Sequence, residues 1–227
     1  MRHIQIAIDG PSGAGKSTVA RALAERMNIV YVDTGALYRT VGYAALARGI
    51  APSDTAGVER LLPSLEIDLR YEEGVQHVLL NGEDLGDRIR RPEVSMAAST
   101  VSAIPAVRAF LLETQRAIAA RNSVVMDGRD IGTVILPNAD IKIFMTASIE
   151  SRAMRRTREL EEKGMPASYE DVLREMRERD EQDRNRSVAP AVPAADAVHF
   201  DNSGMNVEEC VEAVNRLIAE RLMPAEK

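Results

Sequence analysis

The chain has 227 residues, of which 45% are hydrophobic, and carries a formal net charge of −6 at pH 7, so we expect one medium domain or one domain with an insertion. The acidic balance argues against duplex nucleic acid or an anionic membrane as the main partner, and the single cysteine, Cys210, excludes an internal disulfide framework and a cysteine-based metal site. Because no apolar run is long enough for a membrane span and the N-terminus lacks the apolar segment of a signal peptide, we expect a cytoplasmic protein.

The first candidate site is a glycine-rich stretch between a predicted strand and a predicted helix. Residues 10–17 read G-P-S-G-A-G-K-S, the phosphate-binding pattern G-x-x-x-x-G-K-S. The apolar, β-branched run at 4–9 predicts a buried strand, and the apolar side chains spaced four apart over 18–27 predict a helix. Backbone N–H groups of such a loop surround a phosphate, and the start of the following helix adds its positive dipole end.

This loop predicts a site for a nucleoside triphosphate. Lys16 is expected to reach the β- and γ-phosphates, and the Ser17 hydroxyl is expected to ligate Mg²⁺. The expected ATP-binding residues are Gly10, Pro11, Ser12, Gly13, Ala14, Gly15, Lys16, Ser17 and Thr18. The loop alone does not separate a kinase from a GTPase or a motor protein.

The next elements continue the alternation of strands and helices. Residues 29–32 predict a second strand, which ends in Asp33-Thr34-Gly35. A helix is expected over 36–48, with Arg39 in its first turn and Gly49 as its C-terminal cap.

The segment at 63–102 changes character. Residues 67–71 alternate apolar and polar side chains, and a turn joins them to a second extended run at 75–80. Because antiparallel hairpins do not belong inside a parallel βαβ sheet, we interpret 63–102 as an insertion.

The remaining elements complete an α/β fold with a parallel sheet covered on both faces. They are a helix at 105–120, strands at 123–127 and 141–146, helices at 149–163 and 168–185, a strand at 197–201 and a last helix capped by Asn206. We predict a three-layer P-loop fold with a five-stranded parallel sheet, a small antiparallel insertion and a helical lid. Its parts are a core of 1–62, 103–148 and 187–227, an insertion of 63–102, and a lid with its following helix over 149–186.

Several charged side chains follow the carboxyl ends of these strands, where ligands bind in open α/β sheets. Asp127 follows a β-branched run, as a Walker B carboxylate does, and is placed to orient Mg²⁺ directly or through water. Arg39, Arg108 and Arg129 come from three separate segments near this edge, where a second anion could bind. Arg179, Asp183 and Arg186 share a helix face by their spacing, although spacing alone favours an exposed Arg179–Asp183 ion pair.

The chain resembles the bacterial cytidylate kinases nearly from end to end. The matching stretches are residues 8–17 (IDGPSGAGKS), 33–39 (DTGALYR), 127–134 (DGRDIGTV), and Arg179-Asp180 with 183–190 (DRNRSVAP). The third stretch is the most specific, because other P-loop kinases lack it. The family resembles other nucleoside monophosphate kinases, so the resemblance implies that the insertion is a monophosphate-binding domain.

The resemblance also implies roles for individual residues. Thr34, Arg39, Arg129 and Arg186 would hold the acceptor's phosphate; Ser99, Arg108 and Asp130 would read cytosine; Arg179 and Asp183 would bind the ribose hydroxyls. The Asp130 carboxylate can accept from the N4 amino group of cytosine, where uracil presents a carbonyl.

The implied reaction is direct transfer of the γ-phosphoryl group from ATP to CMP or dCMP. Lys16, Arg129 and Arg186 would neutralise charge on the transferring group, with Mg²⁺ bound to ATP and no tightly bound organic cofactor. The lid arginines, expected among Arg152, Arg155, Arg156 and Arg158, would close over the phosphates and exclude water. We expect a monomer with no nucleic-acid or membrane partner.

Two alternatives remain. Another P-loop kinase, acting on UMP, AMP or shikimate, would share the donor loop. A regulatory GTPase would need the guanine-specifying N-K-x-D pattern, but the four lysines lie in the contexts GKS, IKI, EKG and a terminal EK.

Overall fold

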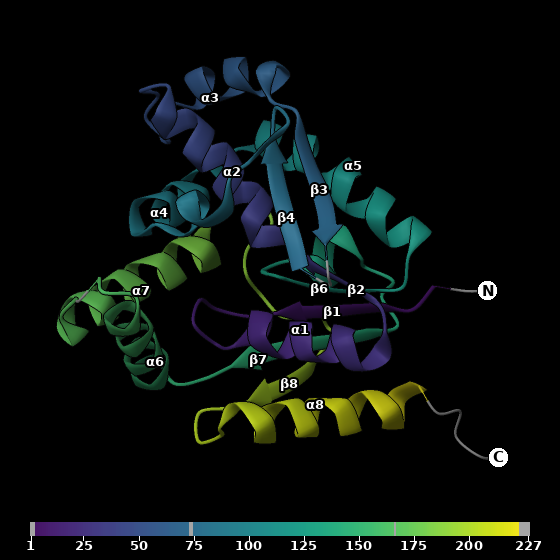
Figure 1. The fold of residues 1–227 in the computed structure, drawn as a ribbon. Coiled ribbons are helices and arrows are strands. Elements are labelled where there is room, and N and C mark those ends of the chain that lie inside the picture. Colours follow the sequence, from purple (N-terminus) through teal and green to yellow (C-terminus); the bar gives the residue numbers. More distant parts are fainter. Residues whose placement is uncertain (1–2, 73–74, 166, 223–227) are drawn as a thin grey trace.

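A five-stranded parallel sheet forms the centre of the protein (Figure 1). The structure, a computed structural model, describes residues 3–72, 75–165 and 167–222. The strands are β1 (Gln5–Asp9), β2 (Val30–Asp33), β6 (Val124–Gly128), β7 (Ile141–Thr146) and β8 (Val198–Asp201). Their order is β2-β6-β1-β7-β8 with every neighbouring pair parallel. The α/β class and the five-stranded parallel sheet predicted from the sequence are confirmed.

Alternating side chains of the sheet face two different apolar clusters. Ile6 and Ile8 pack with α1 (Lys16–Met27) and α8 (Val207–Leu222) on one face. Ala7 packs on the other face with α5 (Pro105–Arg121) and a π-helical turn, η3 (Ile131–Ile135). Because both faces are covered, the strands read as nearly continuous apolar runs in the sequence.

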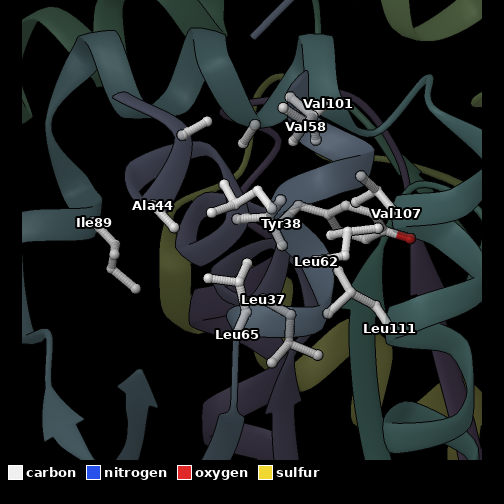
Figure 2. Close-up of a cluster of buried hydrophobic side chains, with 14 of the residues drawn as sticks. Leu37, Tyr38, Ala44, Val58, Leu62, Leu65, Ile89, Val101, Val107 and Leu111 are labelled. Carbon is white, nitrogen blue, oxygen red and sulfur yellow. The ribbon is translucent and has the colours of Figure 1, made fainter. Parts of the chain in front are cut away.

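A third apolar cluster holds the region above the sheet together (Figure 2). It joins α2 (Thr34–Ala47) and α3 (Thr55–Leu61) with α4 (Pro92–Val101) and α5. Leu37, Val58 and Leu111 belong to it and are almost without solvent exposure. This cluster also packs against the small antiparallel sheet, β3 (Ile67–Glu72), β4 (Val75–Leu80) and β5 (Glu83–Asp84), in the order β3-β4-β5.

The inserted segment is only partly antiparallel strand. The predicted hairpin is β3 and β4, whereas the second half contains a 3₁₀ turn, η2 (Gly86–Arg90), and the helix α4, which the alternation of side chains had not predicted. Another 3₁₀ turn, η1 (Leu62–Ser64), leads into β3. The boundaries 63–102 stay a prediction, because this segment shares its apolar cluster with α2 and α5.

Two charged helices, α6 (Ile149–Glu162) and α7 (Tyr169–Asn185), form a hairpin beside α4 (Figure 1). Their contact is a small cluster of Ala153, Leu160, Val172 and Met176. Two sequence expectations need correction at helix ends. The helix α2 begins at Thr34 instead of residue 36, because the Asp33 side chain caps it through Ala36 N–H. Arg186 lies beyond the end of α7 in extended backbone, so it does not share the helix face of Arg179 and Asp183.

Candidate active site

The glycine-rich loop wraps tightly between β1 and α1. Gly10, Gly13 and Gly15 have φ of 145°, 72° and 84°, conformations that favour glycine. A Cβ on Gly10 would lie 1.9 Å from the carbonyl oxygen of Met145 on β7, so a side chain at this position cannot fit. The loop therefore depends on its glycines both for its turn and for its contact with the sheet.

The Lys16 ammonium lies folded within this loop. Its Nζ donates to the carbonyl oxygen of Pro11 at 2.7 Å, and the residue is only 5% exposed. Burial, and then the nearby Arg129 cation, lower the pKa of Lys16 to about 7, although Asp127 and Asp9 act in the opposite direction. An anion placed beside this side chain would favour its charged form.

Ser17 and Asp127 form a pair of hard oxygen donors beside Lys16. The Ser17 Oγ donates to Asp127 Oδ2 at 2.8 Å, while the Tyr31 hydroxyl on β2 donates to Asp127 Oδ1 at 2.8 Å. Burial, and then neighbouring Asp33, raise the pKa of Asp127, so its ionised form would gain from a cation at this point. Mg²⁺ is commonly held by one or two protein oxygens together with water and substrate phosphates, and the Ser17–Asp127 pair fits that role. Within the described part of the chain, no group of three or more His, Cys, Asp or Glu residues could hold a metal ion.

A cavity of about 140 Å³ adjoins Lys16 and Ser17 at the carboxyl edge of the sheet. It is bordered by α2, α4, the loop after β6 and the end of α7. All nine residues predicted for the acceptor line it: Thr34, Arg39, Ser99, Arg108, Arg129, Asp130, Arg179, Asp183 and Arg186. The structure therefore brings together side chains that are far apart in the sequence.

The close packing of α4 on α2 positions Ser99 at this cavity. A Cβ on Gly42 of α2 would lie 3.0 Å from the backbone nitrogen of Ala98, so only a glycine allows this approach of the helices. The Ser99 Oγ then donates to Asp183 Oδ1 at 2.9 Å. Arg129 Nε donates to the other oxygen of the same carboxylate, also at 2.9 Å. Although burial by itself raises the pKa of Asp183, Arg129 and Arg179 hold it below its usual value.

A second buried network surrounds Asp130. Its Oδ2 accepts from Arg108 Nη2, and its Oδ1 lies 3.7 Å from Arg186 Nη2. Burial raises the pKa of Asp130, and the arginines oppose that effect. The Arg108 guanidinium also lies 5.5 Å from the centroid of the Tyr38 ring, which fixes its plane.

Arg39 pairs with Asp33, and the inserted sheet contacts this pair. Arg39 Nη2 donates to Asp33 Oδ2 at 2.7 Å. Although burial raises the pKa of Asp33, Arg39 and the N–H of Ala36 lower it overall. Gln76 on β4 accepts from the backbone N–H of Asp33 at 2.9 Å and donates to its carbonyl oxygen at 3.3 Å. Gln76 therefore connects the inserted sheet to the start of α2.

Three guanidinium nitrogens at the cavity lack a hydrogen-bond partner among the described residues. They are Arg39 Nε, Arg179 Nε and Arg186 Nη2, and each is buried. Buried donors are rarely left unpaired in folded proteins. An anionic ligand in the cavity would satisfy them.

The four predicted lid arginines lie in different environments. Arg152 is buried: it donates to the carbonyl oxygens of Ala147 and Ser12 and pairs with Asp180 at 2.7 Å. Arg155 donates to the carbonyl oxygen of Asn202 at 2.8 Å, and Arg158 is exposed.

Arg156 differs from the other three. It pairs with Glu159 at 2.8 Å and lines a separate cavity of about 250 Å³, which reaches Ser17, Arg39 and Arg179.

Sequence reasoning missed three residues that shape the site. Tyr31 fixes Asp127, Gln76 contacts the backbone of Asp33, and Asp9 binds the turn after Asp130. The strand-end position of Asp9 was a usable signal. No local sequence signal marked Tyr31 or Gln76, because both lie inside predicted strands and their partners are 96 and 43 positions away.

A P-loop and a second, arginine-lined cavity at one edge of a parallel sheet define a P-loop phosphotransferase. The sequence model of the family described as cytidylate kinase matches residues 6–220. The cytidylate kinase of Carboxydothermus hydrogenoformans is 47% identical over 218 residues, covering 96% of this chain and 98% of that protein. The cytidylate kinase of Pelotomaculum thermopropionicum is 49% identical over 210 residues, covering 92% of this chain and 93% of that protein. The chain therefore belongs to the cytidylate kinase family.

A solved structure of an uncharacterized protein from Eubacterium ventriosum has the same fold. It aligns over 96% of this chain and 99% of its own, with a TM-score of 0.51 and 15% identity. Within the described residues, no single helix is long and apolar enough to cross a membrane; α4 and α5 meet the length and composition criteria only as a pair, bent by 100°.

Proposed function

We propose that the protein transfers the γ-phosphoryl group of ATP to CMP or dCMP, giving ADP and CDP or dCDP. Membership of the cytidylate kinase family and curated relatives of that name at 47% and 49% identity support this activity. The observation that carries it is the set of buried guanidinium nitrogens that find no hydrogen-bond partner in the described part of the chain, at a cavity beside the P-loop lysine. The acidic chain acts in the cytoplasm as a monomer, without a nucleic-acid or membrane partner.

The donor triphosphate binds the glycine-rich loop. In the structure, Lys16 Nζ donates to the carbonyl oxygen of Pro11 at 2.7 Å. When the triphosphate binds, Nζ leaves this carbonyl and binds the β- and γ-phosphates. Ser17 and Asp127 would hold Mg²⁺ together with the triphosphate, Asp127 directly or through water. When bound, the ion would neutralise charge on the phosphates during transfer.

The acceptor nucleotide binds the arginine-lined cavity. Thr34, Arg39, Arg129 and Arg186 hold its phosphate, and Asp183 with Arg179 binds the sugar hydroxyls. Ser99, Arg108 and Asp130 read the base, because a carboxylate fixed by Arg108 accepts from the N4 amino group of cytosine. Uracil would present a carbonyl to the same carboxylate, and such a polar mismatch gives strong discrimination.

Transfer requires no covalent intermediate. An oxygen of the acceptor phosphate attacks the γ-phosphorus in line, and the phosphate monoester needs no strong general base because it is already anionic near neutral pH. The chain's contribution is positioning and neutralisation of charge by Lys16, Arg129 and Arg186.

Arg156 is the lid arginine that we assign to the donor phosphates, since it lines a cavity that also reaches Ser17. Arg152 acts differently, by connecting α6 to the glycine-rich loop and to Asp180.

A coupled assay of ADP release tests this function with CMP, dCMP, UMP, AMP and shikimate as acceptors and MgATP as donor. We expect CMP and dCMP to react well above the others. Arg129→Ala should lower kcat/KM for CMP by roughly 100-fold or more, because it removes a cation from the transferring group. Arg60→Ala, on the exposed side of α3, is the matched control. Faster turnover of UMP, AMP or shikimate, or near-normal Arg129→Ala activity, would contradict the assignment.

A further inference from the structure

Asp9 is a buried carboxylate that the reaction described above does not use. It is the last residue of β1, next to the glycine-rich loop, and is only 4% exposed. Its Oδ1 accepts from the N–H of Ile131 at 2.7 Å, and its Oδ2 accepts from the N–H of Gly132 at 2.8 Å. A carboxylate on β1 therefore binds two consecutive backbone donors that lie more than 120 positions away.

These two donors begin the π-helical turn η3, whose N-cap residue is Asp130. An N-cap aspartate usually turns its carboxylate onto the N–H of the second or third residue of its own helix. Asp130 makes no such bond. The second residue is Gly132, whose N–H is already taken by Asp9, so only the N–H of the third, Thr133, is left as a cap target for Asp130.

The carboxylate of Asp130 is thus available for another partner, and it binds Arg108 at the acceptor cavity. The backbone at Gly132 also lies close to Asp9. A Cβ there would be 3.4 Å from Asp9 Oδ2, in van der Waals contact, and 3.1 Å from Lys142 Cδ, which would have to shift.

We propose that Asp9 is a positioning residue for acceptor recognition: by capping the turn that Asp130 would otherwise cap, it keeps the Asp130 carboxylate turned toward Arg108 and the base. The proposal rests on the proposed function for the identity of that base. Asp9 touches neither substrate and acts through the N–H groups of Ile131 and Gly132.

The energetics of Asp9 agree with this role. Burial raises its pKa to about 6, the N–H groups of Gly132 and Ile131 act in the opposite direction, and the charges of Asp130 and Lys16 add smaller effects. A carboxylate in such a position is costly to bury, and in return it supplies two acceptors for two adjacent donors.

Asp9→Asn tests the proposal with almost no change of shape. The amide keeps one acceptor and places an N–H₂ group against the other backbone donor, so Asp130 can turn to cap its own helix. We expect KM for CMP to rise roughly tenfold or more, as for loss of a hydrogen bond to a charged group. Preference for CMP over UMP should fall by a similar factor. KM for MgATP should rise less, through the smaller effect of the Asp9 charge on Lys16, and the cooperativity of thermal unfolding should stay unchanged.

Asp140→Asn is the matched control. Asp140 Oδ2 accepts from the N–H of Gln5 at 2.9 Å, so this substitution changes an aspartate at the opposite end of β1. Asp140→Asn should leave KM for CMP, KM for MgATP and the preference for CMP over UMP as in the wild type.

Gly132→Ala tests the same contact from the other side. Its added methyl group would touch Asp9 Oδ2 and crowd the Lys142 side chain beside this turn, and it should raise KM for CMP selectively. This second variant also carries the test if Asp9→Asn does not fold.

Three outcomes would overturn the proposal: unchanged KM for CMP in both variants, an equal rise in KM for MgATP, or a crystal structure of Asp9→Asn with Asp130 still turned to Arg108. The last readout does not depend on the substrate. A wild-type protein that fails to phosphorylate CMP would instead contradict the proposed function.

Discussion

Binding of MgATP should be accompanied by uptake of a proton at Lys16. Burial and the Arg129 cation lower the pKa of this ammonium to about 7 in the empty site. At pH 8, one unit above that value, only about a tenth of the molecules carry the charge. The bound β- and γ-phosphates favour the charged form, so binding should take up roughly 0.9 proton per site at pH 8 and roughly 0.1 at pH 6.

Isothermal titration calorimetry measures this number directly. MgATP is titrated into the protein in buffers of different ionisation enthalpy, and the slope of observed enthalpy against buffer enthalpy gives the protons taken up. A slope near 0.9 at pH 8 that disappears at pH 6 and in Lys16→Met is the expected result. A slope near zero at pH 8, or the same slope in Lys16→Met, would show that another group titrates or that Lys16 stays charged in the empty site.

Three further changes test the structure. Arg152→Ala removes the partner of the partly buried Asp180 and a bond to the Ser12 carbonyl, so it should lower the free energy of unfolding by roughly 3 kcal/mol and raise KM for ATP; unchanged urea unfolding would contradict a stabilising role of this pair. The pKa of Asp9 is raised from 3.8 to about 6, so the folded protein binds this proton more tightly than the unfolded chain does. The stabilising contribution of Asp9 to the free energy of unfolding is therefore fully present below pH 3.8 and is lost as pH rises through 6. The free energy of unfolding of the wild type should therefore fall by about 3 kcal/mol relative to Asp9→Asn between roughly pH 3.5 and 7, and parallel pH curves would refute this sign. Leu111→Ala, at a side chain 1% exposed, should lower the free energy of unfolding by about 3 kcal/mol and leave kcat unchanged, as measured by urea unfolding and steady-state assay.

The parts of the fold that local sequence determines were predictable. The strand, glycine loop and helix around residues 10–17 occur as expected, because turn chemistry and periodicity act within a few residues. The helix α4 was not predicted although its sequence indicates it, with Pro92 at the first helical position and Val94, Ala97, Ala98 and Val101 at helical spacing. The hairpin pattern before it was extended over the whole of 63–102. The short third strand β5 depends on pairing with β4.

The site itself was predicted as a set of residues but not as a set of partners. Sequence spacing favoured a surface pair of Arg179 with Asp183, whereas Asp183 binds Arg129 and Ser99, which are 54 and 84 positions away. Such partners are chosen by the tertiary fold, so no local pattern reports them.

The internal ion pairs have a consequence for which ligands the cavity selects. Of the five arginines that line the cavity, Arg39, Arg108 and Arg129 already hold Asp33, Asp130 and Asp183, so a large part of its positive charge is matched by its own carboxylates. A ligand that binds these three paired arginines must exchange partners with resident carboxylates, and that part of its affinity is a difference between two sets of contacts. Inorganic phosphate can offer the displaced carboxylates only its own P–OH groups. A nucleotide brings sugar hydroxyls and a base amino group that occupy them, so the exchange itself discriminates against small anions.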